Sequence, residues 1–220
     1  MATIGERLKA RLERKIDQDG YEDDSELYDM LSQGLKMAAE LLKLPGLQMT
    51  DEVSTVTTGN MIDLPADYHH GLFNAYLTDT KDQIEIVNDW ATLLRLTGTS
   101  YADSGDVSMI CDNGAGQLVY DKIPAAATDI TLFYYRAPAD ITYRTTALDG
   151  VPASIAARME KAIVHYAAYL AFEDLENGVE GQKIDTGHNL SLFESIIDDI
   201  QLSIAPVSLP PPTIVRGEFI

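Results

Sequence analysis

The sequence predicts an α+β protein that is mainly α-helical. We expect a helical bundle of two N-terminal and two C-terminal helices, with an inserted small antiparallel β-sheet and an extended C-terminal arm. Three observations support this. Apolar residues recur at helical spacing near both ends of the 220-residue chain. Period-two patterns and turn residues fill its middle. Proline-rich sequence follows the last helical pattern.

The chain is organised around residues 130–176. Residues 130–136 are predicted to form a buried strand, because apolar or aromatic side chains point to both of its faces. One face carries Ile130, Leu132 and Tyr134, and the other carries Phe133 and Tyr135. Both faces therefore need cover. A long helix is then expected to open near Pro152, and its small alanines make it the packing hub. Its apolar stripe comprises Ile155, Met159, Ile163, Tyr166 and Leu170.

Two further helices are predicted before the sheet, at residues 3–16 and 25–43. Both carry leucine or isoleucine at a spacing of four, and both apolar stripes need the hub helix as a third surface. The loop between them superficially resembles a calcium site. A calcium loop starting at Asp17 would need Gly and Glu where the chain has Glu22 and Tyr28. A solvated connector is expected instead.

Residues 50–136 are expected to form one small antiparallel sheet. A first hairpin is predicted around Gly59 and Asn60, between residues 53–56 and 61–64. A second is predicted between residues 107–111 and 117–120. A short strand at residues 83–87 and a brief helix complete the region. Asn88 or Asp89 is expected to cap this helix, which carries Trp90 and Leu93 and stops at Gly98.

The last helix is secure from Leu190 onward, where isoleucines and Phe193 follow one face. The sequence does not fix the first residue of this helix, because Gly181 and Gly187 would each cost about 1 kcal/mol inside it. Beyond it, polyproline is extended and cannot pack as a helix. The end of the chain is either a disordered tail or an arm that docks on a neighbouring subunit. The arm hypothesis assigns partner binding to Pro210, Pro211, Pro212, Ile214, Val215, Phe219 and Ile220.

These elements predict three parts of the chain. Residues 1–48 and 137–205 form the helical bundle domain, and residues 49–136 form the inserted β-rich subdomain. Residues 206–220 form the extended Pro-rich arm.

Composition limits the partners. Asp and Glu number 35 against 16 Lys and Arg, so the formal charge is −19. Binding nucleic acid in a groove is not expected, because phosphate contacts draw on clustered Lys and Arg. The charge serves either solubility alone or a surface past which DNA slides without sticking. No run of apolar residues predicts a membrane span, so the protein is expected in the cytoplasm or in a larger particle assembled there.

No catalytic, metal or cofactor site is predicted, and the chain is not expected to be an enzyme. The sequence lacks a Gly-rich phosphate loop and a Gly-x-Ser-x-Gly elbow. His69 and His70 are adjacent and should point in different directions, and His165 lies five residues after Glu160, off ligand spacing. Cys111, the single cysteine, is expected to be a small core residue.

Three segments of the sequence resemble bacteriophage head-to-tail adaptor proteins. These are the neck or head-completion proteins that lie beneath the portal. The three segments are residues 25–31 opening a helix, residues 62–68 after a strand, and residues 130–138 followed by Val151-Pro152 and an Ala/Tyr-rich helix. The resemblance implies a structural virion protein that forms a ring, normally of twelve copies. Such a ring docks on the portal protein, presents a second face to a tail or nozzle protein, and lets DNA pass without specific binding.

Two alternatives stay open, and a third, an enzyme, would need a pocket that brings His165 or His188 together with carboxylates, which the spacing does not show. A tail-tube completion or other neck protein would contact the tail but not the portal. A monomeric accessory domain with no place in the virion would carry the Pro-rich end as plain disorder.

Overall fold

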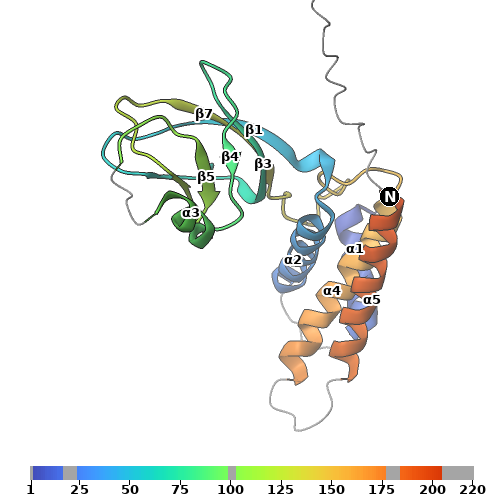
Figure 1. Ribbon diagram of the computed structural model, residues 1–220. Helices are drawn as coiled ribbons and strands as arrows, with labels where there is room; N and C mark the ends of the chain where they lie inside the picture. Colours follow the sequence, from blue (N-terminus) through green and yellow to red (C-terminus); the bar gives the residue numbers. More distant parts are fainter. Residues whose placement is uncertain (1, 17–23, 99–102, 177–183, 205–220) are drawn as a thin grey trace, which may run out of the picture.

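A computed structural model gives the structure of the chain and describes residues 2–16, 24–98, 103–176 and 184–204. Within these ranges five α-helices accompany two small β-sheets, so the prediction of an α+β protein is confirmed. Figure 1 shows the long helices gathered on one side and the strands on the other. The chain is therefore divided into a helical side and a sheet side.

The helical side contains α1 (Ile4–Ile16), α2 (Asp24–Leu42), α4 (Ala156–Glu176) and α5 (Ile184–Ser203). Of these, α4 packs against each of the other three, which places it at the centre of the helical side. Buried side chains from all four helices share one cluster, which includes Leu8, Leu12, Leu31, Leu35, Met159, Ile163, Phe193 and Ile197. Their apolar stripes are covered by one another, as the helical spacing requires.

Two helix starts differ from the prediction. The long helix begins at Ala156 and not near Pro152, because residues 153–155 form a turn in which the Ile155 amide donates to the Pro152 carbonyl. The last helix begins at Ile184, earlier than the secure start at Leu190, and includes Gly187. Packing on α4 and a hydrogen bond from Asn189 to the Asp185 carbonyl stabilise its first turns and offset the cost of the glycine.

The prediction of one antiparallel sheet is wrong, because the strands form two. The first sheet has the order β1-β7-β3 and is antiparallel. The second has the order β2-β6-β5-β4, and its edge pair β4-β5 is parallel. The first sheet comprises β1 (Gln48–Ser54), β3 (Tyr68–Leu77) and β7 (Asp129–Arg136). The second comprises β2 (Met61–Asp63), β4 (Glu85–Ile86), β5 (Met109–Asp112) and β6 (Gln117–Tyr120).

The hairpin predicted around Gly59 and Asn60 is also wrong. Its two arms belong to different sheets, because β1 pairs with β7 and β2 pairs with β6. The Tyr120 hydroxyl lies 3.2 Å from the Val56 carbonyl oxygen and 3.0 Å from that of Gly59, so its single hydrogen can be donated to either one or shared between them. It also accepts from the Val56 amide. Tyr120, on β6 of the second sheet, thus fixes the segment that crosses from β1 in the first sheet to β2 in the second.

Strand β3 has no counterpart in the prediction, although it pairs with the central strand. Its pairing with β7 shifts register between Tyr68 and His70 and again between His70 and Asn74. Gly71, between these points, has a φ of 65°, a left-handed conformation that glycine adopts without strain. The bulged strand lacks a clean alternation of apolar and polar residues, so period-two patterning does not reveal it.

Two apolar clusters hold the sheet side together. The inward face of β7, with Ile130, Leu132 and Tyr134, is buried against residues of the second sheet such as Ile110 and Leu118. A smaller cluster beneath α3 (Trp90–Thr97) contains Leu93, Cys111 and Val119. The predicted hairpin of β5 and β6, the Asp89 cap of α3 and the core position of Cys111 are therefore confirmed.

Candidate interaction surfaces

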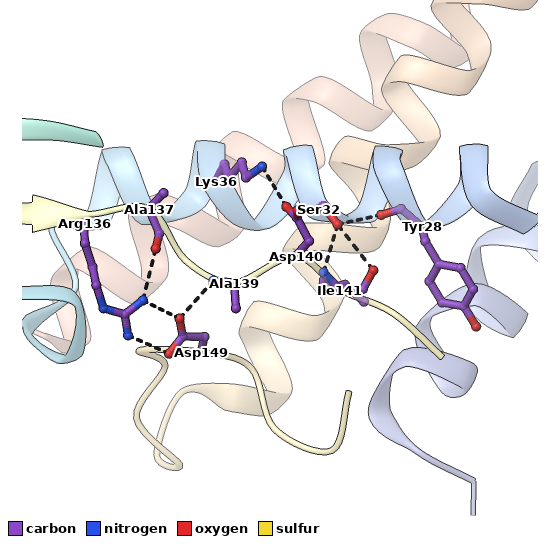
Figure 2. A network of polar contacts seen from close by, with 9 residues as sticks. All are labelled: Tyr28, Ser32, Lys36, Arg136, Ala137, Ala139, Asp140, Ile141 and Asp149. Carbon is purple, nitrogen blue, oxygen red and sulfur yellow. Dashed lines mark hydrogen bonds and ion pairs between the residues drawn. The ribbon is translucent and has the colours of Figure 1, made fainter. Parts of the chain in front are cut away.

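A polar network joins the sheet side to the helical side at the end of β7 (Figure 2). Arg136, the last residue of β7, donates to both oxygens of Asp149, at 2.7 and 2.9 Å. The same carboxylate accepts from the Ala139 amide at 2.9 Å. The hydrogen bonds from Arg136 are the main cause that lowers the pKa of Asp149, and the same hydrogen bonds raise the pKa of Arg136. This network closes the connecting segment 137–149 into a loop with fixed ends.

The same segment is attached to α2 by Ser32, as Figure 2 shows. The Ser32 hydroxyl donates to the Tyr28 carbonyl at 2.7 Å and accepts from the Ile141 amide at 2.9 Å. Ser32 is buried, so these hydrogen bonds satisfy polar groups that water cannot reach. Nearby, Lys36 and Asp140 form an exposed ion pair. These contacts fix the connecting segment against α2.

A second polar cluster lies within the helical side. The Glu160 carboxylate on α4 accepts from Arg7 at 2.7 Å and from Arg11 at 2.9 Å, both on α1. Glu160 is buried, whereas both arginines are largely exposed. The two arginines neutralise the buried carboxylate and fix α1 against the central helix. Glu160 is thus a structural residue, paired with α1 and not with His165.

The outward face of the first sheet carries a row of aromatic rings, which we call the aromatic row: Tyr135, Phe73, Phe133 and Tyr76. Neighbouring ring centroids lie 5.2 Å apart for Tyr135 and Phe73, 6.0 Å for Phe73 and Phe133, and 5.7 Å for Phe133 and Tyr76. Phe73 is 45% exposed, and Phe133 and Tyr76 are half-buried. The row is an apolar strip at the surface, flanked by β1 residues that include Gln48 and Thr50.

A groove of about 380 Å³ adjoins the Tyr135 end of this row. It lies where the end of α2, the turn after it, β1 and the end of α5 meet. Its lining includes Leu41, Pro45, Gln48, Tyr135, Gln201 and Ile204. Gln48 donates to the Tyr135 hydroxyl at 3.2 Å, so the groove combines apolar walls with amide groups that can form hydrogen bonds.

The histidines are placed differently from the expectation. His69 and His70 point toward each other, with their Nδ1 atoms 2.7 Å apart, because the bulge in β3 brings successive side chains together. His70 also stacks on Tyr135 at a centroid distance of 5.2 Å, and burial lowers its pKa. Its Nε2 is buried and has no hydrogen-bond partner among the described residues.

Within the parts of the chain that the structure describes, no group of three or more His, Cys, Asp and Glu side chains is arranged to hold a metal ion. His165 contacts Asn189 on α5, with its Nδ1 3.2 Å from the amide oxygen, and burial lowers its pKa. Burial raises the pKa of Cys111 to about 11, so its thiol stays protonated near neutral pH. Among the described helices, none has both the length and the apolar character that crossing a bilayer requires.

The residues predicted to bind a partner lie outside the described residues. These are Pro210, Pro211, Pro212, Ile214, Val215, Phe219 and Ile220. The calcium-like segment also falls largely outside them. The structure adds the aromatic row, which the sequence analysis missed. A signal was available, because residues 72–77 contain Phe73 and Tyr76 in a run without proline.

Comparison with known proteins identifies the class as bacteriophage adaptor proteins. The chain belongs to the SU10 adaptor protein family, whose family model matches residues 3–211. The resemblance to head-to-tail adaptors is thereby confirmed. Membership indicates a structural phage protein of the virion that contacts other capsid or tail components. No curated protein matches the chain.

Proposed function

We propose that this protein is a head-to-tail adaptor that forms a ring between the portal protein and a tail or nozzle protein. The observation that carries the proposal is the family match, which spans residues 3–211 and so both the helical and the sheet side. The role is structural, with no catalytic step and no cofactor. Twelve copies are expected in the ring, in keeping with the resemblance to neck proteins.

The helical side supplies the ring body in this proposal. The helical side corresponds to the predicted bundle domain, residues 1–48 and 137–205. Residues 49–136 form the inserted subdomain on the sheet side. A closed ring of identical subunits needs heterologous contacts, in which two different surfaces of each copy meet. Rigid subunits support such closure because small angular errors accumulate around a ring. The Arg136–Asp149 and Ser32–Ile141 contacts favour this rigidity.

The charge supports the passage of DNA through the ring. The formal charge of −19 suits a channel that must not trap DNA. Repulsion between like charges acts over about 8–10 Å at physiological ionic strength. DNA would therefore slide through without specific binding.

The predicted arm, residues 206–220, supplies a contact outside the ring body. We assign partner binding to Pro210, Pro211, Pro212, Ile214, Val215, Phe219 and Ile220. Burial of their apolar side chains must exceed a backbone cost of about 1–2 kcal/mol for each residue that becomes ordered. Deleting residues 206–220 should weaken assembly on the portal, and unchanged affinity of the truncated chain would contradict the assignment.

Quantitative mass spectrometry of purified particles from the source phage tests the whole proposal. The copy number of this chain should be close to that of the portal protein, as expected for two rings that dock on each other. A chain that is absent from the particle would instead be a monomeric accessory domain. A chain that is present and that purifies with tail components but not with the portal would be a tail-tube completion or other neck protein.

A further inference from the structure

The aromatic row and the polyproline sequence of this chain have complementary chemistry. Polyproline adopts an extended helix with about three residues per turn and a rise of about 3.1 Å per residue. Protein surfaces that bind such segments are lined by aromatic side chains, on which prolines pack while their carbonyls remain free to accept hydrogen bonds. The row offers Phe73, which is exposed, and Phe133 and Tyr76, which are half-buried; Tyr135 is buried at its end, where the Gln48 amide bonds to its hydroxyl.

We propose that the aromatic row is the docking surface for the polyproline segment of the same chain, residues 210–212. Three prolines extend over about 9 Å. The ring centroids of the row are spaced between 5.2 and 6.0 Å. The segment can therefore contact at least two successive rings, of which Phe73 is the most accessible.

The path of the chain favours this occupant. Ile204, the last described residue, lines the same groove as Gln48 and Tyr135, so the chain leaves α5 beside one end of the row. Pro210 follows Ile204 by six residues, and an extended chain reaches about 3.3–3.6 Å per residue. The prolines can thus travel roughly 20 Å from Ile204, which is enough to reach Phe73 and Phe133 from the groove.

The tether also favours the same chain over a second copy. A short flexible connection holds its two ends at an effective concentration in the millimolar range. Prolines of a second copy, at micromolar concentration, cannot compete with the tethered prolines as long as residues 205–209 are long enough to span the distance from Ile204 to the row. Charge does not oppose docking, because the polyproline residues are uncharged and the row is apolar.

This inference rests on the proposed function and deepens it. It reassigns the three prolines, residues 210–212, from the partner to the subunit's own sheet and leaves partner binding to the apolar residues that follow them. Docked prolines would make the following residues leave the surface from one fixed point. Ile214, Val215, Phe219 and Ile220 would then be presented to the partner from a defined place on the sheet side. The docking itself concerns the isolated subunit, so its test does not depend on assembly.

Disulfide trapping in the full-length protein tests the docking. Thr50 pairs with Phe133 across β1 and β7, so both side chains lie on the outward face. The variant Thr50→Cys/Thr213→Cys should form a disulfide within one chain under mild oxidation. The matched control is Asp51→Cys/Thr213→Cys, because Asp51 is the next residue of the same exposed strand and points to the opposite face. Cys111 is buried in both variants.

We expect the Thr50 variant to react about tenfold faster than the Asp51 control, because docking raises the local concentration on one face only. Equal rates would overturn the proposal. A disulfide that joins two chains, seen as a dimer on a nonreducing gel, would also overturn it by making a second copy the occupant.

A second variant tests whether the prolines, and not other residues of the C-terminal arm, carry the docking. Changing Pro210→Ser, Pro211→Ser and Pro212→Ser in the Thr50→Cys/Thr213→Cys background should remove most of the rate advantage. An unchanged rate would show that other residues dock and would contradict the assignment to polyproline. Particle copy number is measured independently, so failure of the docking and failure of the adaptor proposal are distinguishable.

Discussion

Arg136 and Asp149 form a two-point ion pair that closes the connection between the central strand and the helical side. Both side chains are less than one-third exposed, at 26% and 29%. Two parallel hydrogen bonds fix the angle of the guanidinium as well as its distance. The residue at the end of β7 therefore sets where the chain leaves the sheet and approaches α2.

Replacing Asp149→Asn should lower the free energy of unfolding by about 1.5–3 kcal/mol, because one charge-assisted pair and the bond from the Ala139 amide are weakened. Chemical denaturation measures this change. The matched control is Asp140→Asn, which removes the exposed pair with Lys36. Its effect should stay below about 1 kcal/mol, as for other surface ion pairs. Equal effects of the two changes would contradict the structural role of Asp149.

The lowered pKa of Asp149 predicts acid sensitivity. The usual value is 3.8, and the folded-state pKa lies below it, so the unfolded chain binds more protons between the two values. The stabilisation is fully present above about pH 5 and is lost as the pH falls through the folded-state pKa. Denaturation between pH 6 and pH 2.5 should show the wild-type protein and Asp149→Asn converging in stability at the acid end. A constant difference across this range would contradict the prediction.

Replacing Glu160→Gln should also destabilise the protein, by about 1.5–3 kcal/mol, because Arg7 and Arg11 lose the anion that they share. Thermal unfolding followed by circular dichroism measures the change. Glu13→Gln is a suitable control, since the exposed Glu13 pairs with Lys9 one turn earlier in α1. The control should cost less than about 0.5 kcal/mol. A comparable loss in both variants would mean that Glu160 contributes no more than a surface charge.

Two glycines in helices should respond oppositely to alanine. A Cβ at Gly5 would lie 1.9 Å from the carbonyl oxygen of Thr142, so Gly5→Ala must displace α1 from the connecting segment. A Cβ at Gly187 would meet nothing within 4 Å. Gly187→Ala should therefore stabilise the protein by about 1 kcal/mol through helix propensity. Melting temperatures should fall for the first variant and rise for the second, and a fall in both would contradict this account.

Tyr120→Phe tests the crossover between the sheets. The hydroxyl is the group that contacts the backbone of Val56 and Gly59, and the ring itself is fully buried. Removing it leaves those backbone groups less well satisfied and should cost about 1–3 kcal/mol. Tyr143→Phe, at an exposed position, is the control and should have almost no effect. Stability equal to wild type in Tyr120→Phe would mean that water replaces the lost contacts.

Sequence patterning was sufficient where the determinant is local. The helices at residues 4–16 and 24–42, the Asp89 cap and the stop at Gly98 all follow from spacing within one or two turns. The central strand was also predictable from its run of apolar residues, but the expectation that both of its faces are covered is only partly met. Ile130, Leu132 and Tyr134 are buried, whereas Phe133 on the other face is only half-buried at the surface. The resemblance to phage adaptors rests on local sequence as well, namely residues 25–31, 62–68 and 130–138.

Only the tertiary structure decided which strands pair and which side chains meet. Thr50 and Phe133 are neighbours across two strands that lie far apart in the sequence, and no local pattern specifies that register. The bulge that brings His69 onto His70, and the row that joins Phe73 to Tyr135, arise from the same long-range pairing. Periodicity determines which residues must be buried, whereas the choice of partner depends on how the whole chain satisfies its backbone and its core together.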